Sequence, residues 1–303
     1  MTRYSPLATP AATIEYLKQW GLHTNKSLGQ HFLIDDGIVG RILKCADIKP
    51  DDRIIEVGPG IGTLTAALLA QGAMVYAIEK DQKLLNPLAV SFANEQGFVL
   101  IPADALDIPE VKRSASDTFG AGGKPLKLVA NLPYAVAATI VLSYFEQFPT
   151  LGSATVMVQR EVAERMMAQP NSKEYGAYTV KLRLLAEPQD SFAVARTNFL
   201  PPPRVDSTVI CLHRHTSSIP YEMYKATSFV VEAAFAQRRK TIRNSMRAHF
   251  FIHNHNTALV DTLLARANID PQRRGETLSV QEFIALGSIM ALLEDTAVQL
   301  GSE

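Results

Sequence analysis

The chain has 303 residues, of which 47% are hydrophobic, and its 30 Lys and Arg residues balance its 30 Asp and Glu residues. This length allows a full α/β core together with a smaller second domain, and the zero net charge gives no global sign of a polyanionic partner. No apolar run approaches the roughly 18 residues that span a bilayer, and the N-terminus lacks the layout of a secretory signal. We therefore expect a cytoplasmic protein with no membrane segment.

The chain contains two cysteines, Cys45 and Cys211, which lie far apart in the sequence. Such sparse and widely separated cysteines favour reduced, buried thiols. A disulfide between them is the alternative.

In the N-terminal region, the sequence predicts two helices with an irregular polar segment between them. Thr9 and Pro10 suit the start of a helix, and Gly21 suits its end. The polar residues 23–33 are either a surface loop or a segment folded over a cofactor. Residues 38–46 have the apolar spacing of a second, core-facing helix.

A glycine-rich turn follows the short apolar run Arg53–Ile55 and precedes an apolar helical stretch, Leu64–Ala70. Its glycines are Gly58, Gly60 and Gly62. A strand, a glycine turn and a helix let the backbone approach a nucleotide-like ligand closely. A dinucleotide fingerprint would place its third glycine at position 63, where the chain has Thr63, which weakens an NAD interpretation. The plainer alternative is a tight corner between strand and helix.

Two carboxylates follow the next two predicted strands. Glu79 ends the run that starts at Val75, and Asp104 follows the run Phe98–Ile101. An acid in the first position can take both hydroxyls of a ribose, and one in the second can accept from the amine of adenine. Each acid alone is better explained as a solvated strand end than as a ligand contact. Together with the glycine turn they predict an adenosine site without a phosphate cradle, which S-adenosylmethionine fits.

Helices and strands alternate up to about residue 160, which is typical of a parallel sheet with helices on both faces. The Gly- and Ser-rich residues 114–127 interrupt this pattern as a loop. We therefore predict an α/β fold, with a doubly covered sheet of Rossmann-like type.

The turn Asn131-Leu132-Pro133-Tyr134 follows the apolar strand that runs from Leu126 to Ala130. The Asn131 side-chain oxygen and the Leu132 carbonyl could accept the two hydrogens of an adenine amine and favour a pyramidal nitrogen. Pro133 would fix the turn, and Tyr134 would stack on the target base. Catalysis would then consist mainly of alignment and electrostatics. The alternative is a plain Asn-Pro turn with a packed tyrosine.

The β pattern ends after two further predicted strands, Tyr178–Ala186 and Ser207–Leu212, between which a proline triplet forms a stiff connection. Three helices are predicted beyond residue 220: Tyr221–Phe250, Thr257–Ala267 and Val280–Ala297. We place the domain boundary near 215–220. The expected domains are a catalytic domain, 1–216, and a helical RNA-recognition domain, 217–303.

The stretch Gln237–Arg247 is basic and contains no acidic residue. On one continuous helix, Lys240, Arg243, Asn244 and Arg247 share a face, as phosphate contacts require. A solvated basic face is the alternative. His253 and His255 form only a weak metal signal, and we expect no metal.

Taken together, these motifs resemble the KsgA/RsmA family of ribosomal RNA adenine dimethyltransferases. The resemblance covers nearly all of the chain after the first twenty residues or so. It includes Lys26–Leu33, the glycine turn, the two acids, the Asn131–Tyr134 turn, Phe199–Ser207, the basic stretch and Arg274–Leu278. The glycine motif alone would indicate only a class I methyltransferase.

The resemblance implies transfer of methyl groups from S-adenosylmethionine to the N6 atoms of two adjacent adenosines near the 3′ end of 16S rRNA, in a partly assembled small ribosomal subunit. We expect the enzyme to act as a monomer. The residues expected to bind the cofactor are Gln30, His31, Leu33, Gly58, Gly60, Glu79, Asp104, Ala105 and Asn131. The expected catalytic residues are Asn131, Leu132, Pro133 and Tyr134. The expected RNA-binding residues are Arg238, Arg239, Lys240, Arg243 and Arg247.

His31 departs from the asparagine that many members of this family carry. Two rival functions remain open. One is an Erm-like enzyme that dimethylates a 23S rRNA adenosine. The other is a non-catalytic ribosome-assembly or RNA-binding factor that keeps the fold.

Overall fold

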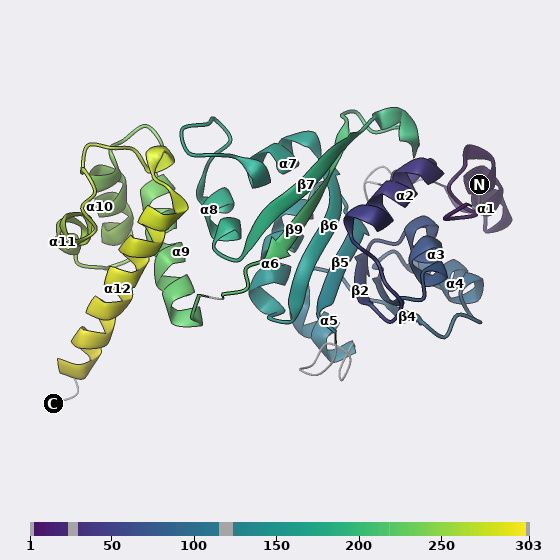
Figure 1. Ribbon diagram of the computed structural model, residues 1–303, viewed down its shortest axis with the longest axis horizontal. Coiled ribbons are helices and arrows are strands. Elements are labelled where there is room, and N and C mark those ends of the chain that lie inside the picture. Colours follow the sequence, from purple (N-terminus) through teal and green to yellow (C-terminus); the bar gives the residue numbers. More distant parts are fainter. Residues whose placement is uncertain (1–2, 24–29, 115–123, 218, 301–303) are drawn as a thin grey trace. The chain divides into compact units, whose positions relative to one another are not determined.

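The computed structural model describes residues 3–23, 30–114, 124–217 and 219–300 (Figure 1). The chain forms two compact units, and each is built from two segments. The first unit is Met1–Ala163 with Pro188–Arg214, and the second is Glu164–Glu187 with His215–Glu303. The chain passes from the first unit to the second for the last time after Arg214, next to the boundary expected near 215–220. The segment Glu164–Glu187, which the expected catalytic domain 1–216 included, groups instead with the C-terminal helices.

The N-terminal region begins with helix α1 (Pro10–Gln19), as the sequence predicts. The Thr9 hydroxyl accepts a hydrogen bond from the Ala12 N–H at 3.2 Å, and Pro10 occupies the first helical position, where its missing donor costs nothing. Strand β1 (Phe32–Leu33) and helix α2 (Asp36–Cys45) follow. Residues 26–29 of the predicted cofactor segment lie outside the described residues.

The first unit is built around a seven-stranded, mostly parallel sheet with the strand order β4-β3-β2-β5-β6-β9-β7, which confirms the predicted α/β class. Strands β4, β3, β2, β5 and β6 run parallel, and β9 pairs antiparallel with β6. The strands are β2 (Arg53–Val57), β3 (Met74–Ile78), β4 (Phe98–Ile101), β5 (Leu126–Asn131), β6 (Leu151–Gln159), β7 (Ala186–Val194) and β9 (Ser207–Arg214). A short strand, β8 (Phe199–Leu200), pairs with β1 in a separate two-stranded sheet.

Helices cover both faces of this sheet. Helices α2 and α3 (Thr63–Ala70) pack on the face that includes Ile54 and Val129. The neighbouring residues Ile55 and Leu128 point to the opposite face and are also fully buried, because α6 covers part of it. The remaining helices that start in this unit are α4 (Gln82–Ser91), α5 (Ile108–Ser114), α6 (Ala137–Gln147) and α7 (Arg160–Met167). Within the described residues, no helix is long and apolar enough to cross a membrane.

The expectation of two free thiols is wrong, because Cys45 and Cys211 form a disulfide with their Cα atoms 6.5 Å apart. Cys45 is the last residue of α2. Cys211 lies two residues after Val209, which packs against α2, and therefore faces the same side of the sheet. Their separation of 166 residues in the sequence concealed this proximity.

The second unit is helical, but two of its predicted elements are wrong. Residues 177–183 form helix α8 (Ala177–Arg183) and not a strand, because Val180 packs into the helical core, and tertiary packing overrides local β propensity. The single helix predicted over 221–250 is divided into α9 (Tyr221–Phe235) and α10 (Ile242–Ile252). Thr241 caps α10, and the Ile242 N–H donates to the Arg273 carbonyl at 2.6 Å. Helices α11 (Leu259–Arg266) and α12 (Val280–Leu300) complete the unit.

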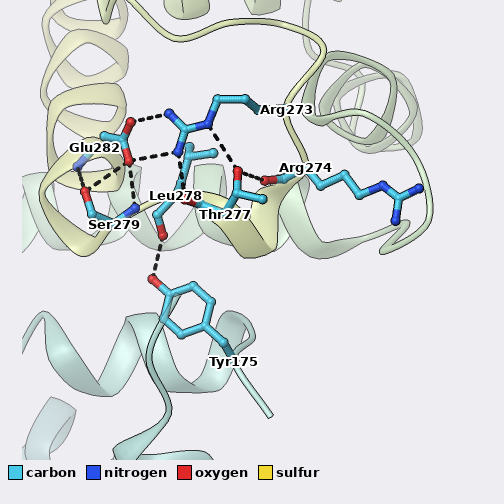
Figure 2. Close-up of polar contacts among 7 residues, drawn as sticks. All are labelled: Tyr175, Arg273, Arg274, Thr277, Leu278, Ser279 and Glu282. Atoms are coloured by element: carbon cyan, nitrogen blue, oxygen red, sulfur yellow. Dashed lines mark hydrogen bonds and ion pairs between the residues drawn. The ribbon is translucent and has the colours of Figure 1, made fainter. Parts of the chain in front are cut away.

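The turn before α12 is held by a polar network around Arg273 (Figure 2). The guanidinium of Arg273 donates to both carboxylate oxygens of Glu282 and to the Thr277 carbonyl, the latter at 2.7 Å. Glu282 and Ser279 also form a reciprocal capping box at the start of α12. Within this turn lies Gly275, where a Cβ atom would come within 2.7 Å of the Ala234 carbonyl oxygen on α9. The glycine is therefore required for the close approach of the two backbones.

Candidate active site

The glycine turn between β2 and α3 has the backbone conformation that only glycine adopts readily. Gly58, Gly60 and Gly62 have φ angles of 66°, 62° and 87°. A Cβ atom on Gly62 would lie 2.5 Å from the Phe92 ring, so this glycine serves packing. Gly58 and Gly60, in contrast, line a cavity of about 860 Å³.

Glu56, before the glycine turn, and Thr63, after it, contribute polar groups to this cavity. Neither residue was predicted to belong to the site. Glu56 is 2% exposed, and burial raises its pKa to about 8. Its carboxyl accepts hydrogen bonds from the Thr65 hydroxyl, at 2.6 Å, and from the Thr65 backbone. The Thr63 hydroxyl is buried and has no hydrogen-bond partner among the described residues. Thr63 thus offers an unpaired polar group to a ligand.

The two predicted acids lie at the carboxyl ends of neighbouring strands. Glu79 follows β3 and is 7% exposed, and burial raises its pKa above the ordinary value. Its carboxylate accepts from the Asp81 N–H at 2.8 Å and from the Gly60 backbone, which ties it to the glycine turn. Asp104 follows β4 and forms an ion pair with Lys80, whose Nζ lies 3.4 Å from its carboxylate.

The turn after β5 is held from two sides. The Asn131 side-chain amide donates from Nδ2 to the His31 carbonyl at 3.1 Å. This bond directs the amide oxygen away from His31, and no described residue donates to that oxygen. The Tyr134 hydroxyl lies 2.6 Å from the Ser207 Oγ, and the Tyr134 ring stacks on the His31 ring with 5.7 Å between centroids.

All predicted cofactor-binding and catalytic residues line the same cavity. These are Gln30, His31, Leu33, Gly58, Gly60, Glu79, Asp104, Ala105, Asn131, Leu132, Pro133 and Tyr134. Pro201, Pro202 and Pro203 also line it, although their sequence predicted only a stiff connection. The pairing of β1 with β8 brings them there. Apart from the resemblance to the family, a run of three prolines does not indicate that these residues line a cavity.

The charged groups of the cavity wall are mainly acidic. The acidic residues are Glu79, Asp81 and Asp104, and the basic residues are Lys80 and Arg204. Glu56 also lines the wall, but its raised pKa keeps it protonated and uncharged at neutral pH. Such a wall opposes a pyrophosphate and favours a neutral or cationic ligand. Among the residues that the structure describes, no group of three or more His, Cys, Asp or Glu side chains is placed to hold a metal ion.

The basic stretch does not form one helical face, because residues 236–241 connect two helices. Arg243 and Arg247 both pair with Asp261 on α11, with the Arg243 Nε 2.7 Å from the carboxylate. Arg238 donates to the carbonyls of Lys173 and Tyr175. Arg239 and Lys240 are exposed, and no other described side chain pairs with their charges.

Comparison with known proteins identifies the family to which the chain belongs. Residues 21–286 match the model of the family described as ribosomal RNA adenine dimethylase. The chain is 41% identical over 284 residues to the ribosomal RNA small subunit methyltransferase A of Pelotomaculum thermopropionicum, which covers 92% of this chain and 96% of the relative.

Two solved structures show the same fold at lower identity. One is a dimethyladenosine transferase from Plasmodium falciparum, with a TM-score of 0.68 and 22% identity over 84% of this chain and 96% of that chain. The other is the 23S rRNA methyltransferase ErmE, with a TM-score of 0.61 and 23% identity over 86% of this chain and 99% of that chain. The family match and the extent of the sequence identity together show that the chain belongs to the ribosomal RNA adenine dimethylase family.

Proposed function

We propose that this enzyme transfers methyl groups from S-adenosylmethionine to the N6 atoms of two adjacent adenosines near the 3′ end of 16S rRNA. Its substrate is then a partly assembled small ribosomal subunit, on which it acts as a cytoplasmic monomer. The observation that carries this proposal is Asn131, whose amide is oriented by the His31 carbonyl and whose oxygen remains available at the cavity wall. The small-subunit assignment is supported by the name of the relative that matches over 96% of its own length.

The cavity fits S-adenosylmethionine on four counts. Glycines at 58 and 60 let backbone form the wall without Cβ atoms, and Glu79 contributes a carboxylate to the same wall, which we propose accepts from the ribose hydroxyls. The unpaired Thr63 hydroxyl at the start of α3 suits a polar ligand group. The acidic wall suits a sulfonium better than a pyrophosphate.

When bound, the cofactor supplies an electrophilic methyl group and a neutral thioether as its leaving group. The protein has to present the adenine amine, which is a poor nucleophile because its lone pair is delocalised into the ring. The Asn131 oxygen and the Leu132 carbonyl are proposed to accept the two amine hydrogens and so favour a pyramidal nitrogen. Because Asn131 is held by His31 before substrate arrives, this contact needs no reorganisation during the reaction.

Of the predicted RNA-binding residues, we propose that Arg239 and Lys240 contact phosphates directly, since both are exposed. Arg243 and Arg247 are proposed to support this surface through Asp261. That triad keeps a net positive charge while holding α10 against α11.

The deciding experiment exposes undermethylated small and large subunits to labelled cofactor and maps the product nucleotides. Dimethylation of two adjacent 16S adenosines supports the proposal. Product on a 23S adenosine would establish the Erm-like alternative. Cofactor binding without transfer to either subunit would establish the non-catalytic alternative.

Single-turnover rates then test Asn131 itself. At saturating cofactor and subunit, Asn131→Ala should slow transfer by about 10²–10³-fold, by analogy with the loss of one oxyanion-hole donor. Subunit binding should change far less. Asn94→Ala, at an exposed position, is the matched control. A near-normal rate for Asn131→Ala would leave the turn with a structural role only.

A further inference from the structure

The residues of the cavity wall that are exposed to solvent form two groups. Lys80 and Asp104 lie after β3 and β4 and pair with each other. Ala135, Pro202 and Arg204 form the other group, which belongs to the turn after β5 and to the proline segment. Because β2 lies between β3 and β5 in the sheet, the two groups are on different sides of the glycine turn.

The segment that carries Arg204 is fixed at both ends to the turn after β5. At its start, the Pro201 carbonyl oxygen lies 2.8 Å from Nδ1 of His31, whose own carbonyl accepts from the side-chain amide at the beginning of the turn. At its end, the Ser207 Oγ lies 2.6 Å from the Tyr134 hydroxyl. Arg204 is therefore held beside the turn before any ligand binds.

The charge of Arg204 is available to a ligand. Within the part of the chain that the structure describes, no side chain or carbonyl pairs with its guanidinium, whereas the other basic residue of the wall, Lys80, already pairs with Asp104. A free guanidinium offers two parallel donors to an anion such as a phosphate. Because the rest of the wall is mainly acidic and repels anions, an anion that binds Arg204 stays at the exposed edge of the cavity.

An RNA substrate brings such an anion to this edge. When an adenine leaves its stack and enters a pocket, the backbone phosphates next to it remain outside with the strand. We propose that Arg204 binds a backbone phosphate beside the target adenosine and so holds the base against the Asn131–Tyr134 turn. This inference rests on the proposed function, because it takes the cavity to receive an RNA adenine. It adds an RNA contact in the first unit to those proposed for Arg239 and Lys240 in the second.

Single-turnover methylation of undermethylated small subunits tests this contact. At saturating cofactor and subunit, Arg204→Gln should slow transfer by roughly tenfold, because a subunit held by its other contacts keeps the target base in the cavity for less of the time. Arg204→Lys keeps the charge and should restore part of the rate. Arg196→Gln removes the same charge from an exposed residue between β7 and β8 that does not line the cavity, and it should match the wild type.

The salt dependence of subunit binding provides a second measurement. Loss of one phosphate contact should reduce the slope of log affinity against log salt concentration by about 0.7, the value for a contact to a single strand. This reduction is expected in Arg204→Gln and not in Arg204→Lys or Arg196→Gln. The affinity for S-adenosylmethionine, measured by calorimetry, should be unchanged in all three variants, which also shows that they are folded.

The outcomes separate this inference from the proposed function. If Arg204→Gln matches the wild type in rate and in salt slope, Arg204 is only a solvated side chain, so the inference is overturned and the proposed function stands. A loss of cofactor affinity with unchanged subunit binding would also overturn it, since Arg204 would then bind the carboxylate of the cofactor. Equal slowing by Arg196→Gln would show a general effect of charge and would overturn it as well. If the wild type methylates neither subunit, the proposed function itself is wrong and this inference fails with it.

Discussion

Replacing Glu56 with glutamine should stabilise the protein more strongly as the pH rises. Glu56 is 2% exposed, and burial raises its pKa from 4.5 to about 8, an effect that the bonds from Thr65 only partly oppose. The folded protein therefore keeps this carboxyl protonated at neutral pH, whereas the unfolded chain releases the proton. Glutamine has nearly the same shape, keeps an oxygen for the Thr65 hydroxyl and does not titrate.

The size of this effect on the free energy of unfolding follows from the difference between the pKa values of Glu56 in the folded and unfolded states. Each unit of difference corresponds to about 1.4 kcal/mol, so a gap of about 3.5 units sets an upper limit of about 5 kcal/mol. Because the folded-state pKa of this acid is raised, the unfolded state binds fewer protons over this range. The contribution of Glu56 to stability is therefore lost progressively from about pH 4.5 to about pH 8. Allowing for water penetration, we expect about 2–4 kcal/mol between about pH 5 and about pH 8.

Urea unfolding of the ligand-free protein at several pH values measures this effect. The quantity of interest is the free energy of unfolding of Glu56→Gln minus that of the wild type. Other titrating groups largely cancel in this difference, which should grow with pH. Glu15→Gln, at an exposed position on α1, should show no such trend. A difference that stays constant from about pH 5 to about pH 8 would refute the assignment of a buried, protonated Glu56.

Three further predictions concern other parts of the molecule. Glu79→Gln and Asp104→Asn should each weaken S-adenosylmethionine binding by about 1.5–3 kcal/mol in calorimetry, through the loss of a charge-assisted bond, and unchanged affinity would place that acid outside the site. Charge reversal of Arg239 and Lys240 should weaken subunit binding and flatten its salt dependence, with cofactor affinity unchanged. Normal methylation by this variant at physiological salt would show that these two side chains are only solvated and do not bind RNA. Gly275→Ala should lower the free energy of unfolding by about 1–3 kcal/mol, because its Cβ would meet the Ala234 carbonyl at 2.7 Å, and a urea midpoint like that of the wild type would contradict this.

The parts of the fold that are predictable from the sequence are those with a strong local signal. Buried parallel strands appear as continuous apolar runs, and their carboxyl ends share one edge of the sheet. This geometry is why Glu79, Asp104 and Asn131 can be grouped from the order of residues alone. The start of α1 is equally clear, because Thr9 and Pro10 carry the capping chemistry in sequence.

The features that are not predictable depend on partners far away in the chain. The stretch from Arg238 to Arg247 resembles a free cationic face, because nothing local indicates that Asp261 neutralises part of it. Nothing near Tyr134 in the sequence indicates that the His31 ring stacks against it. The residues of helix α8 predict a strand because Val180 is β-branched, and its burial against other helices decides otherwise.

Neither unit is a continuous stretch of chain, and this affects how the protein can be synthesised and divided. Residues 164–187 leave the ribosome before α9–α12, yet Tyr175 and Val180 belong to the core that those helices complete. Until then, apolar side chains that are at most 1% exposed in the folded protein face solvent. A fragment that stops at residue 216 keeps this segment without its core, and exposed apolar surface of this kind promotes aggregation. Separating the two units therefore requires excision of residues 164–187 as well as a stop codon.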